Sequence, residues 1–442
     1  MKAIILVGGK GTRLGKVTAR TPKPLVAVGD KPVLRHQLEM LKRAGIDEVI
    51  ISAHHFAQAI EDYIADLPAS FPRVRVVVES SPRGTAGAVA DIAKHWNEDF
   101  LVLYGDVMMD VDVKHFVSWH MSKAADVSLA LHPNDHPFDS DLVMVEDDGR
   151  ISGWHPSPHD GQWRRNLVSA GLYMMHPRVL TSVPSTGMVD FGKHVFPILV
   201  KSNVCFGYVT PEYLKDMGTP KRLKEVRGDL ASGLIPRRSR QHARPTIFLD
   251  RDGVINEYIS HIHILDDFRL LQGVASAIRH MNQAGYLVVV VTNQPVVARG
   301  LCSEDDVRHM HCKMETLLGN EGAYVDAIYF CPHHPDKGFE GENVKYKIEC
   351  ECRKPKTGMV RQAVKDWNID LASSWLIGDS VRDVACGRAA GIKTIAVGKL
   401  AGGSEVGGAD LVCADLPTAV AHVLMQTRQE KTLVREGQGV VH

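Results

Sequence analysis

The sequence predicts an α/β protein of two domains, each built on a mostly parallel sheet flanked by helices. Its 442 residues exceed what one ordinary core accommodates, so two or three domains are expected. Short apolar runs typical of buried strands alternate with segments of helical periodicity, which is the pattern of parallel sheets. This alternation fades once, at residues 229–245, and then starts again, so we expect one domain on each side.

The first domain is expected at residues 1–228. Residues 32–45 carry apolar side chains at helical spacing and end on Gly45, a typical residue after a helix, and residues 86–96 are a second helix candidate. Strands that alternate with helices in this way run parallel, with helices on both faces of the sheet. The apolar runs that predict the strands are 2–7, 48–52, 74–78 and 100–104.

Residues 229–245 are predicted to be a linker, because glycine, proline and arginine interrupt any apolar period there. The second domain is expected at residues 246–425, followed by a polar tail at 426–442 to which we assign no role. Strands are predicted at 246–250, 286–293, 327–330, 374–379 and 393–398, with helices such as 273–284 and 304–318 between them.

The composition is that of a globular protein, with 44% hydrophobic and 24% charged residues. A formal net charge of zero removes the broad basic surface of a nucleic-acid-binding protein, so no nucleic acid partner is expected. No apolar run approaches the ~18 residues of a membrane helix, and the N-terminal run is too short for a signal peptide. We therefore expect a cytoplasmic protein that acts on small molecules without a membrane partner; a homo-oligomer is left open.

Three predicted strands of the second domain end in polar residues, and the ligands of a parallel sheet bind beyond such strand ends. Asp250 would attack a phosphoryl group and form an aspartyl-phosphate, while Asp252 would protonate the leaving oxygen and later activate water. Thr292 and Lys354 would stabilise charge on the transferring oxygens. A carboxylate beside a phosphoryl group needs a cation to offset repulsion, so Mg²⁺ is expected. The predicted magnesium ligands are Asp250, Asp252, Asp379 and Asp383.

Cysteines are concentrated in the second half of the chain, where Cys331, Cys350 and Cys352 gather around a histidine. In a reducing compartment a bound metal fits this arrangement better than disulfides, and unrelated buried thiols are the alternative. His334 and His311 have no clear partner in the sequence, and we expect both at the surface.

Four segments, "FLDRDGVIN", "TNQ", "CRKP" and "GDSVRD", together resemble the ordered motifs of the haloacid dehalogenase superfamily. The segments "CPHH" and "CEC" resemble the zinc loop of its heptose bisphosphate and histidinol phosphate phosphatases, and "TNQPVVARG" is closer to the D-glycero-D-manno-heptose 1,7-bisphosphate 7-phosphatases. The resemblance implies a structural Zn²⁺ and substrate binding by Asn293, Arg299 and Arg353. Pro295 and Val296 stand where that family commonly has serine and glycine. The implied zinc ligands are Cys331, His333, Cys350 and Cys352.

The first domain carries a loop rich in glycine and basic residues at 6–25, "LVGGKGTRLGKVTARTPKPL". It is not a dinucleotide-binding fingerprint, because Leu14 stands where glycine is needed, and not a Walker A loop, because Val17 follows the glycine and lysine. What remains is a turn with exposed N–H groups that could wrap a triphosphate, with a bare glycine turn as the alternative. Further along, Asp106 and Asp216 could share one Mg²⁺ between a nucleotide and a second phosphate.

The segments "GGKGTRL", "PRGTAGAV", "YGD" and "DMGTP" together resemble the sugar-1-phosphate nucleotidyltransferases, which have a Rossmann-like fold, over most of residues 1–225. Among these the resemblance is to the D-glycero-α-D-manno-heptose 1-phosphate guanylyltransferases. Two departures lie on the sugar side, where Ser169 replaces an asparagine and the glutamate expected before Lys193 is missing. The resemblance implies that Gly8, Gly9, Gly11, Thr12 and Arg13 hold the triphosphate, that Lys23 contacts phosphate in the transition state, that Glu79 and Gly84 line the base pocket, and that Lys193 reaches the sugar phosphate.

Together the two resemblances predict a bifunctional enzyme of nucleotide-activated heptose biosynthesis. One domain would remove the 7-phosphate of a heptose 1,7-bisphosphate, and the other would join the resulting 1-phosphate to GMP from GTP, giving GDP-heptose and pyrophosphate. Three alternatives are left open: the same activities on another sugar or nucleotide, a histidinol-type phosphatase joined to an unrelated transferase, and a phosphatase with a non-catalytic nucleotide-binding regulatory domain.

Overall fold

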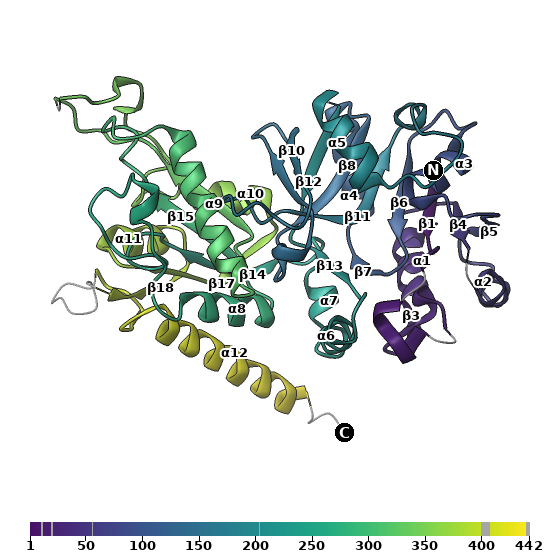
Figure 1. Ribbon diagram of the computed structural model, residues 1–442. Helices are drawn as coiled ribbons and strands as arrows, with labels where there is room; N and C mark the ends of the chain where they lie inside the picture. The colour runs from purple at the N-terminus through teal and green to yellow at the C-terminus, as the bar shows by residue number, and fades with distance from the viewer. Residues whose placement is uncertain are drawn as a thin grey trace. The chain divides into compact units, whose positions relative to one another are not determined.

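The chain forms two compact units, shown in the computed structural model of Figure 1. The structure describes residues 1–9, 12–18, 21–54, 56–202, 204–338, 340–398 and 407–438. The N-terminal unit consists of Met1–His132, Phe138–Asp160 and Leu167–Gln241. The C-terminal unit consists of His242–His442 together with two short segments from the first half of the sequence, Pro133–Pro137 and Gly161–Asn166.

The N-terminal unit contains a nine-stranded sheet whose main path is β10-β9-β11-β6-β1-β4-β5, with β8 paired to β11 and β12. Strand β1 lies between β4 and β6 and is parallel to both, and these strands with β5 confirm the four predicted from apolar runs. Beyond β6 the pairing changes, because β11 is antiparallel to β6 and to β8. The strand bounds are β1 Lys2–Leu6, β4 Glu48–Ala53, β5 Arg73–Val78, β6 Phe100–Tyr104, β8 Val127–His132, β9 Leu142–Val145, β10 Ile151–His155, β11 Val168–Met175 and β12 Cys205–Val209.

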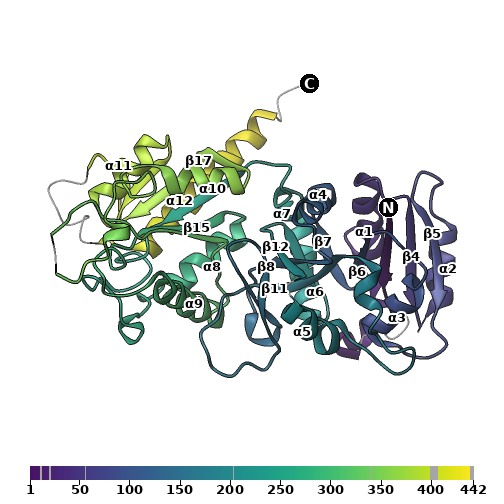
Figure 2. The ribbon, with the colours of Figure 1, turned by 90° about the horizontal axis from the view of Figure 1, so that it is seen from above.

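Helices cover both faces of this sheet, as Figure 2 shows. Alternate residues of β1 point to opposite faces: Ile5 packs with Leu38 of α1, and Ile4 packs with Val89 of α3. Both predicted helices are present, and Gly45 follows α1 in the left-handed conformation that favours glycine. The helix bounds are α1 Val33–Arg43, α2 Ala57–Ala65, α3 Gly84–Ala93, α4 Val113–Lys123, α5 Phe196–Leu199, α6 Pro220–Ala231 and α7 Leu234–Arg237.

Two small two-stranded sheets complete the N-terminal unit. One pairs β2, Ala27–Val28, with β3, Lys31–Pro32. The other pairs β7, Val107–Asp110, with β13, Tyr213–Asp216, in antiparallel register. The second sheet brings the end of β13 beside the start of β7, which directly follows the polar end of β6.

The segment predicted as a linker is partly helical. Helix α6 continues to Ala231 and α7 follows, where Leu234 and Ile235 are buried and Ile235 joins a small apolar cluster of the N-terminal unit. The division between the two units falls after Gln241, and β14 begins at Arg244. The apolar pair was too short to produce a period in the sequence, so its burial was not predicted.

The C-terminal unit contains a six-stranded sheet in the order β16-β15-β14-β17-β18-β19, and every pair in it is parallel. The five predicted strands are confirmed. Their bounds are β14 Arg244–Leu249, β15 Leu287–Asn293, β16 Ala327–Cys331, β17 Ile369–Gly378 and β18 Lys393–Ala396, and β19 spans Leu411–Val412.

Both faces of the second sheet are covered by helices as well. On one face Ile247 of β14 packs with Ile278 of α8 and Val420 of α12, and on the other Phe248 packs with Val360 of α10. Helix α12 continues through most of the segment predicted as a polar tail. None of the helices in the described ranges has the length and apolar character needed to cross a membrane. The helix bounds are α8 Val274–Ala284, α9 Glu304–Asn320, α10 Gly358–Asp366, α11 Val381–Ala389 and α12 Leu416–Gln438.

Candidate active sites and a candidate metal centre

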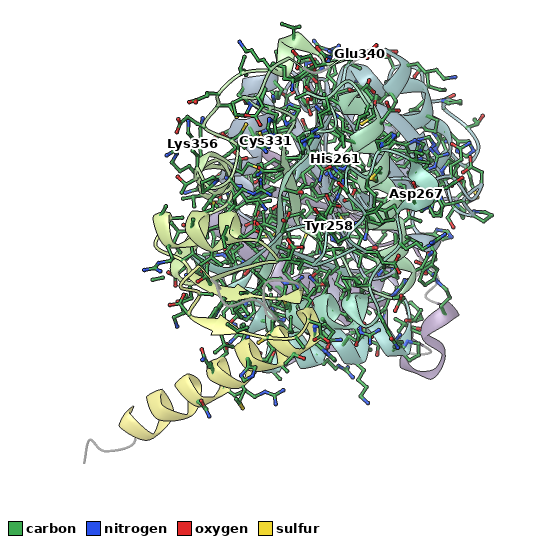
Figure 3. The ribbon with its side chains drawn as sticks, turned by 90° about the vertical axis from the view of Figure 1, so that its left-hand side faces the viewer. Tyr258, His261, Asp267, Cys331, Glu340 and Lys356 are labelled. Carbon is green, nitrogen blue, oxygen red and sulfur yellow. The ribbon has the colours of Figure 1, made fainter. Side chains whose placement is uncertain are left out.

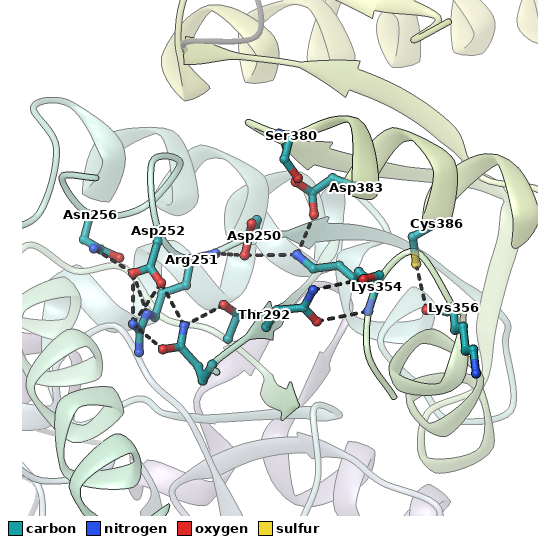
Figure 4. A network of polar contacts seen from close by, with 12 residues as sticks. Asp250, Arg251, Asp252, Asn256, Thr292, Lys354, Lys356, Ser380, Asp383 and Cys386 are labelled. Carbon is teal, nitrogen blue, oxygen red and sulfur yellow. Dashed lines mark hydrogen bonds and ion pairs between the residues drawn. The ribbon is translucent and has the colours of Figure 1, made fainter. Parts of the chain in front are cut away.

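A buried lysine joins two carboxylates at the carboxyl end of the C-terminal sheet (Figure 4). Lys354 Nζ lies 3.0 Å from Asp250 Oδ1 and 2.5 Å from Asp383 Oδ1. Lys354 is 2% exposed and Asp383 is fully buried. Ser380 donates a hydrogen bond of 2.6 Å to the other oxygen of Asp383 and so fixes its orientation. Three of the four motifs that were separate in the sequence therefore meet at this lysine.

Burial and charge act in opposite directions on this group. Burial raises the pKa of Asp250 to about 7, although the positive charge of Lys354 opposes the rise. Burial lowers the pKa of Lys354, but Asp250 and Asp383 outweigh burial and raise it, so the lysine remains charged. A further cation beside Asp250 would favour its ionised, nucleophilic form.

Asp250, Asp379 and Asp383 form a group that could hold a cation, since one carboxylate oxygen of each lies within 4.8 Å of the others. Oxygen ligands of this kind suit Mg²⁺. Asp379 approaches the loop after β14 closely: a Cβ atom on Gly253 would lie 2.2 Å from Asp379 Oδ2, and Gly253 has a φ of +81°. Glycine is therefore required there for Asp379 to face Asp250.

Asp252, the fourth predicted magnesium ligand, does not belong to that group among the described residues. Its carboxylate is held by side-chain donors instead. The guanidinium of the fully buried Arg251 donates two hydrogen bonds of 3.0 Å, one to each oxygen. Gln294 donates to Oδ2 at 2.8 Å and Asn256 to Oδ1 at 3.0 Å. With four donors on its two oxygens, the carboxylate of Asp252 is held in place by the protein itself, and it lies outside the group that could hold a cation.

A cavity of about 350 Å³ opens over these groups. It contains the predicted residues Thr292, Asn293, Arg299 and Arg353, and it also contains Arg382, which sequence reasoning missed. Asn293 exchanges two hydrogen bonds with the backbone of Lys354, at 3.1 and 3.0 Å, and so positions the lysine as well. Three arginines in one cavity are suited to a second anionic group of a substrate.

Aromatic and histidine side chains form part of the same cavity wall. Tyr258 and His261 line it, and Figure 3 shows them on the face of the unit that also carries Cys331. His334 lines the cavity too, so its expected place on open surface is wrong. The loop of residues 258–262 carries no recognisable motif, and only the fold brings it over the catalytic aspartates.

The expectation that His311 lies at the surface is also wrong. It is 5% exposed on the inner face of α9, and its Nε2 lies 3.3 Å from Nη1 of Arg251. Burial lowers the pKa of His311 well below its usual value, and the charge of Arg251 lowers it further. A neutral His311 can accept a hydrogen bond from Arg251, which itself holds Asp252.

The four predicted zinc ligands lie together, each contributing one atom within 4.8 Å of the others. Cys331 and Cys350 Sγ are 3.6 Å apart, Cys350 and Cys352 Sγ 3.2 Å, and His333 Nδ1 is 3.3 Å from Cys352 Sγ. Tetrahedral Zn²⁺ with bonds of about 2.3 Å needs ligand atoms at roughly these separations, so the residues fit a structural zinc ion. Hydrogen bonding from Cys331 lowers the pKa of Cys352 to about 5, which favours a thiolate at neutral pH.

The Cys/His cluster also supports the cavity. Nη1 of Arg353 donates a hydrogen bond of 3.1 Å to the backbone oxygen of His333. Arg353 therefore connects the candidate metal centre with the predicted phosphate-binding end of the cavity.

The N-terminal unit has a cavity of about 310 Å³ at the carboxyl ends of β1 and β6. The predicted residues that line it are Gly8, Gly9, Lys23, Glu79, Gly84 and Asp106. Lys23 Nζ lies 2.8 Å from Asp106 Oδ2. Of the other residues predicted to hold the triphosphate, Gly11 and the side chain of Thr12 lie outside the described residues.

The backbone of Asp216 lies beside that of Asp106, because β13 pairs with β7, but Asp216 is not among the residues that line the cavity in the described ranges. Asp216 is opposite Val107 in the register, and Met217 N donates to Asp106 O at 3.1 Å. The carboxylate of Asp216 accepts a hydrogen bond of 2.7 Å from Arg222. Arg13 is close by, since a Cβ atom on Gly218 would lie 2.9 Å from Asp216 Oδ1 and 3.2 Å from Arg13 Nη2.

Other predictions for this cavity differ in outcome. Lys193 is exposed on the helical turn Phe191–Val195 and is not among the residues that line the cavity in the described ranges. Thr85, Tyr104 and Asp190 do line it, and sequence reasoning missed them. One signal for Asp190 was present in the sequence: it stands in the segment before Lys193 that departs from the pattern of the sugar-1-phosphate nucleotidyltransferases.

Comparison with known proteins gives a family match for each half of the chain. Residues 2–233 match the nucleotidyl transferase family, and residues 351–421 match a HAD-hydrolase-like family. A D-glycero-beta-D-manno-heptose-1,7-bisphosphate 7-phosphatase from Haemophilus ducreyi is 40% identical over 184 residues, which are 41% of this chain and 98% of that protein.

For the N-terminal half, a mannose-1-phosphate guanylyltransferase from Mycobacterium tuberculosis is 32% identical over 237 residues. These are 53% of this chain and 66% of that protein. Among solved structures, HddC from Yersinia pseudotuberculosis matches with 26% identity and a TM-score of 0.45, over 52% of this chain and 99% of its own.

Proposed function

The chain belongs to the nucleotidyl transferase family through residues 2–233 and, through its second half, to the family of heptose-bisphosphate 7-phosphatases, and from this premise we propose that it performs two consecutive reactions on one heptose phosphate. The C-terminal unit removes the 7-phosphate of D-glycero-D-manno-heptose 1,7-bisphosphate. The N-terminal unit transfers GMP from GTP to the heptose 1-phosphate, giving GDP-heptose and pyrophosphate. The observation that carries this proposal is the presence of two cavities, each with a lysine–aspartate pair at the carboxyl end of a parallel strand.

In the phosphatase reaction, Asp250 attacks the 7-phosphorus and the bond from phosphorus to the sugar oxygen breaks. Asp252 gives its proton to that oxygen, and after the heptose 1-phosphate has left it takes a proton from the water that hydrolyses the aspartyl-phosphate. Lys354 stabilises charge on the transferring oxygens. Mg²⁺ held by Asp250, Asp379 and Asp383 would offset the repulsion between carboxylate and phosphate.

The 1-phosphate must survive this reaction, because the second reaction needs it as nucleophile. Arg299, Arg353 and Arg382 lie in the cavity with Asp250 and can bind a second phosphate by bidentate hydrogen bonds. The phosphate held by the arginines is then the one that is not cleaved. The Cys/His cluster, with zinc bound, would hold Arg353 in place through the backbone of His333.

In the transfer reaction, an oxygen of the heptose 1-phosphate attacks the α-phosphorus of GTP and pyrophosphate leaves. Lys23 beside Asp106 contacts the phosphates, and Arg13 near Asp216 offsets charge on the leaving group. Mg²⁺ at Asp106 and Asp216 would supply further charge neutralisation. Catalysis consists mainly of positioning, as phosphoryl-type transfer requires.

The choice of guanine and of heptose is supported by the relatives. The relative of the N-terminal half is named as a guanylyltransferase, and those of the C-terminal half act, by name, on a heptose 1,7-bisphosphate. A 7-phosphatase releases a 1-phosphate, which is the nucleophile that a sugar-1-phosphate guanylyltransferase consumes. One sugar thus connects both halves of the chain.

The decisive experiment supplies the whole chain with heptose 1,7-bisphosphate and GTP and follows phosphate, pyrophosphate and GDP-heptose by ³¹P nuclear magnetic resonance. Parallel reactions contain ATP, CTP or dTTP, and the α and β anomers of the bisphosphate are used separately. We expect GDP-heptose as the only nucleotide sugar and one phosphate released per sugar. Faster turnover with another nucleotide would refute the guanylyl assignment, and release of both phosphates at similar rates would refute the selective phosphatase.

A further inference from the structure

The N-terminal cavity is lined by three carboxylates, and Asp190 differs from the other two. Both oxygens of Glu79 accept hydrogen bonds, from Ser52 Oγ at 2.8 Å and from Arg83 N at 3.1 Å. Asp106 is paired with Lys23. Asp190 has no ion pair within the described part of the chain, and its Oδ2 has no hydrogen-bond partner there. One acceptor atom is therefore available to a ligand.

The position of Asp190 is fixed by the backbone around it. Val189 O accepts hydrogen bonds from Ala86 N at 2.8 Å and Gly87 N at 3.1 Å, and Val189 N donates to Arg83 O at 2.9 Å. A Cβ atom on Gly84 would lie 2.6 Å from Val189 O, so only glycine permits this close approach. The segment before Asp190 is thus attached to the start of α3.

The side chain of Asp190 is oriented by Thr85. Its Oδ1 is 3.3 Å from Thr85 N and 3.4 Å from Thr85 Oγ1, both of which are donors. Thr85 Oγ1 in turn accepts a hydrogen bond of 2.9 Å from Phe191 N. Thr85 occupies Oδ1, and Asp190 lines the cavity, so Oδ2 remains as an acceptor for a ligand there. A side chain positioned in this way loses little conformational freedom on binding a ligand.

The chemistry of the cavity restricts what Asp190 can bind. Phosphates belong at Lys23 and the glycine-rich loop, and an unpaired carboxylate would repel them. The neutral donor groups of the two substrates are their sugar hydroxyls and the N–H edge of guanine, and the base is expected at Glu79 and Gly84 in this cavity. Tyr104 adds a hydroxyl beside Asp190: burial raises its pKa and the charge of Asp190 raises it further, so it stays protonated. Tyr104 packs against Tyr173, whose hydroxyl accepts a hydrogen bond of 3.3 Å from Ser169 Oγ.

We propose that Asp190 accepts hydrogen bonds from ring hydroxyl groups of the sugar 1-phosphate and thereby determines which sugar the N-terminal unit accepts. This inference rests on the proposed nucleotidyl transfer and adds a specificity-determining residue to it. Ser169 and the missing glutamate mark this side of the cavity as different from the expected pattern. Asp190 supplies a carboxylate there from a different position in the sequence.

The test is the substitution Asp190→Asn, studied in the full chain. Asparagine keeps an oxygen that accepts from Thr85 and replaces the free acceptor by an amide NH₂ donor. We expect the KM for heptose 1-phosphate to rise roughly 10- to 100-fold, because a charged acceptor is lost, while the KM for GTP stays within about twofold. Asp66→Asn, the same change at an exposed position after α2, serves as control and leaves both values unchanged.

The readouts separate this inference from the proposed function. A wild-type chain that turns over heptose 1-phosphate while Asp190→Asn shows an unchanged KM for the sugar would overturn the inference alone. A rise confined to the KM for GTP would also overturn it, since Asp190 would then bind the ribose or the base of GTP. A wild-type chain that releases no pyrophosphate with any sugar 1-phosphate would overturn both. Equal hydrogen exchange in α3 of wild type and variant shows that the effect does not come from altered structure.

Discussion

The two catalytic cavities hold their lysine–aspartate pairs in different ways. In the C-terminal unit, Lys354 is 2% exposed and joins Asp250 to the fully buried Asp383. In the N-terminal unit, Lys23 binds Asp106, whose side chain is 30% exposed. Lys354 and Asp250 belong to a buried network with Asp383 in which the lysine offsets both carboxylates. Lys23 and Asp106 lie at the wall of an open cavity. The same chemical pair is therefore buried in one unit and partly exposed to solvent in the other.

The largest effects that sharpen this comparison are catalytic. Asp250→Asn removes the nucleophile, and we expect a loss of at least about 1,000-fold in phosphate release from the bisphosphate, with pyrophosphate release from supplied heptose 1-phosphate unchanged. Asp106→Asn should do the reverse, lowering nucleotidyl transfer by about 100-fold or more through lost charge neutralisation. Each variant is the control for the other. Loss of both activities in either single variant would contradict two separate sites.

The stability of the two units should respond differently to loss of the lysine. Lys354→Met leaves Asp250 and Asp383 without a cationic partner, and we expect it to destabilise the C-terminal unit by about 3–5 kcal/mol. Lys23→Met should cost the N-terminal unit no more than about 1 kcal/mol, because Asp106 remains hydrated. Hydrogen-exchange mass spectrometry of β14 and of β1 reports each unit separately. Equal protection losses for the two variants would show that burial does not distinguish the pairs.

The Cys/His cluster provides a second difference, since no such cluster occurs among the described residues of the N-terminal unit. We expect elemental analysis to find one zinc per chain. Cys352→Ser should lower zinc affinity at least tenfold and raise the KM for the bisphosphate, because Arg353 loses its support at His333. Cys302→Ser, outside the cluster, is the matched control. Full zinc content in Cys352→Ser would contradict the assignment of this ligand.

The smallest predicted effect concerns His311. Its pKa is lowered in the folded chain, so the unfolded chain binds a proton first as pH falls below about 6.5, and stability is lost from that pH downward. The loss approaches at most about 1.4 kcal/mol per pH unit. His311→Gln, which cannot titrate, should show a shallower pH dependence of C-terminal unit unfolding between pH 6.5 and 5. Parallel curves for wild type and variant would exclude His311 as the cause.

Sequence reasoning located the strands and the residues at their ends, and it did so for a physical reason. A buried parallel strand is an apolar run, and ligands bind beyond its carboxyl end, so Asp250 and Asp106 could be placed at the cavities without coordinates. The four residues of the Cys/His cluster were named through their resemblance to a zinc loop, and the structure brings them together. Such local rules apply to residues whose neighbours along the chain define their role.

The remaining residues were missed because their roles depend on distant contacts. His311 lies on an amphipathic helix. Its partner Arg251 stands 60 residues earlier in the chain, so the contact exists only in the folded structure. Arg382 lies within a recognised motif, yet its place in the cavity depends on how α11 packs. Asp190 belongs to no motif and is placed by the backbone of α3. Periodicity and spacing contain no information about such pairings.

The close approach of Asp379 to Gly253 restricts which codon changes residue 253 can tolerate. Every change in the first or second base of a glycine codon introduces a side chain, or a stop, at this position. Any such side chain would meet an oxygen of Asp379 and displace it from Asp250. In a population, the codon for residue 253 should therefore vary only in its third base for as long as the phosphatase is under selection, even if the other half of the chain has lost its use.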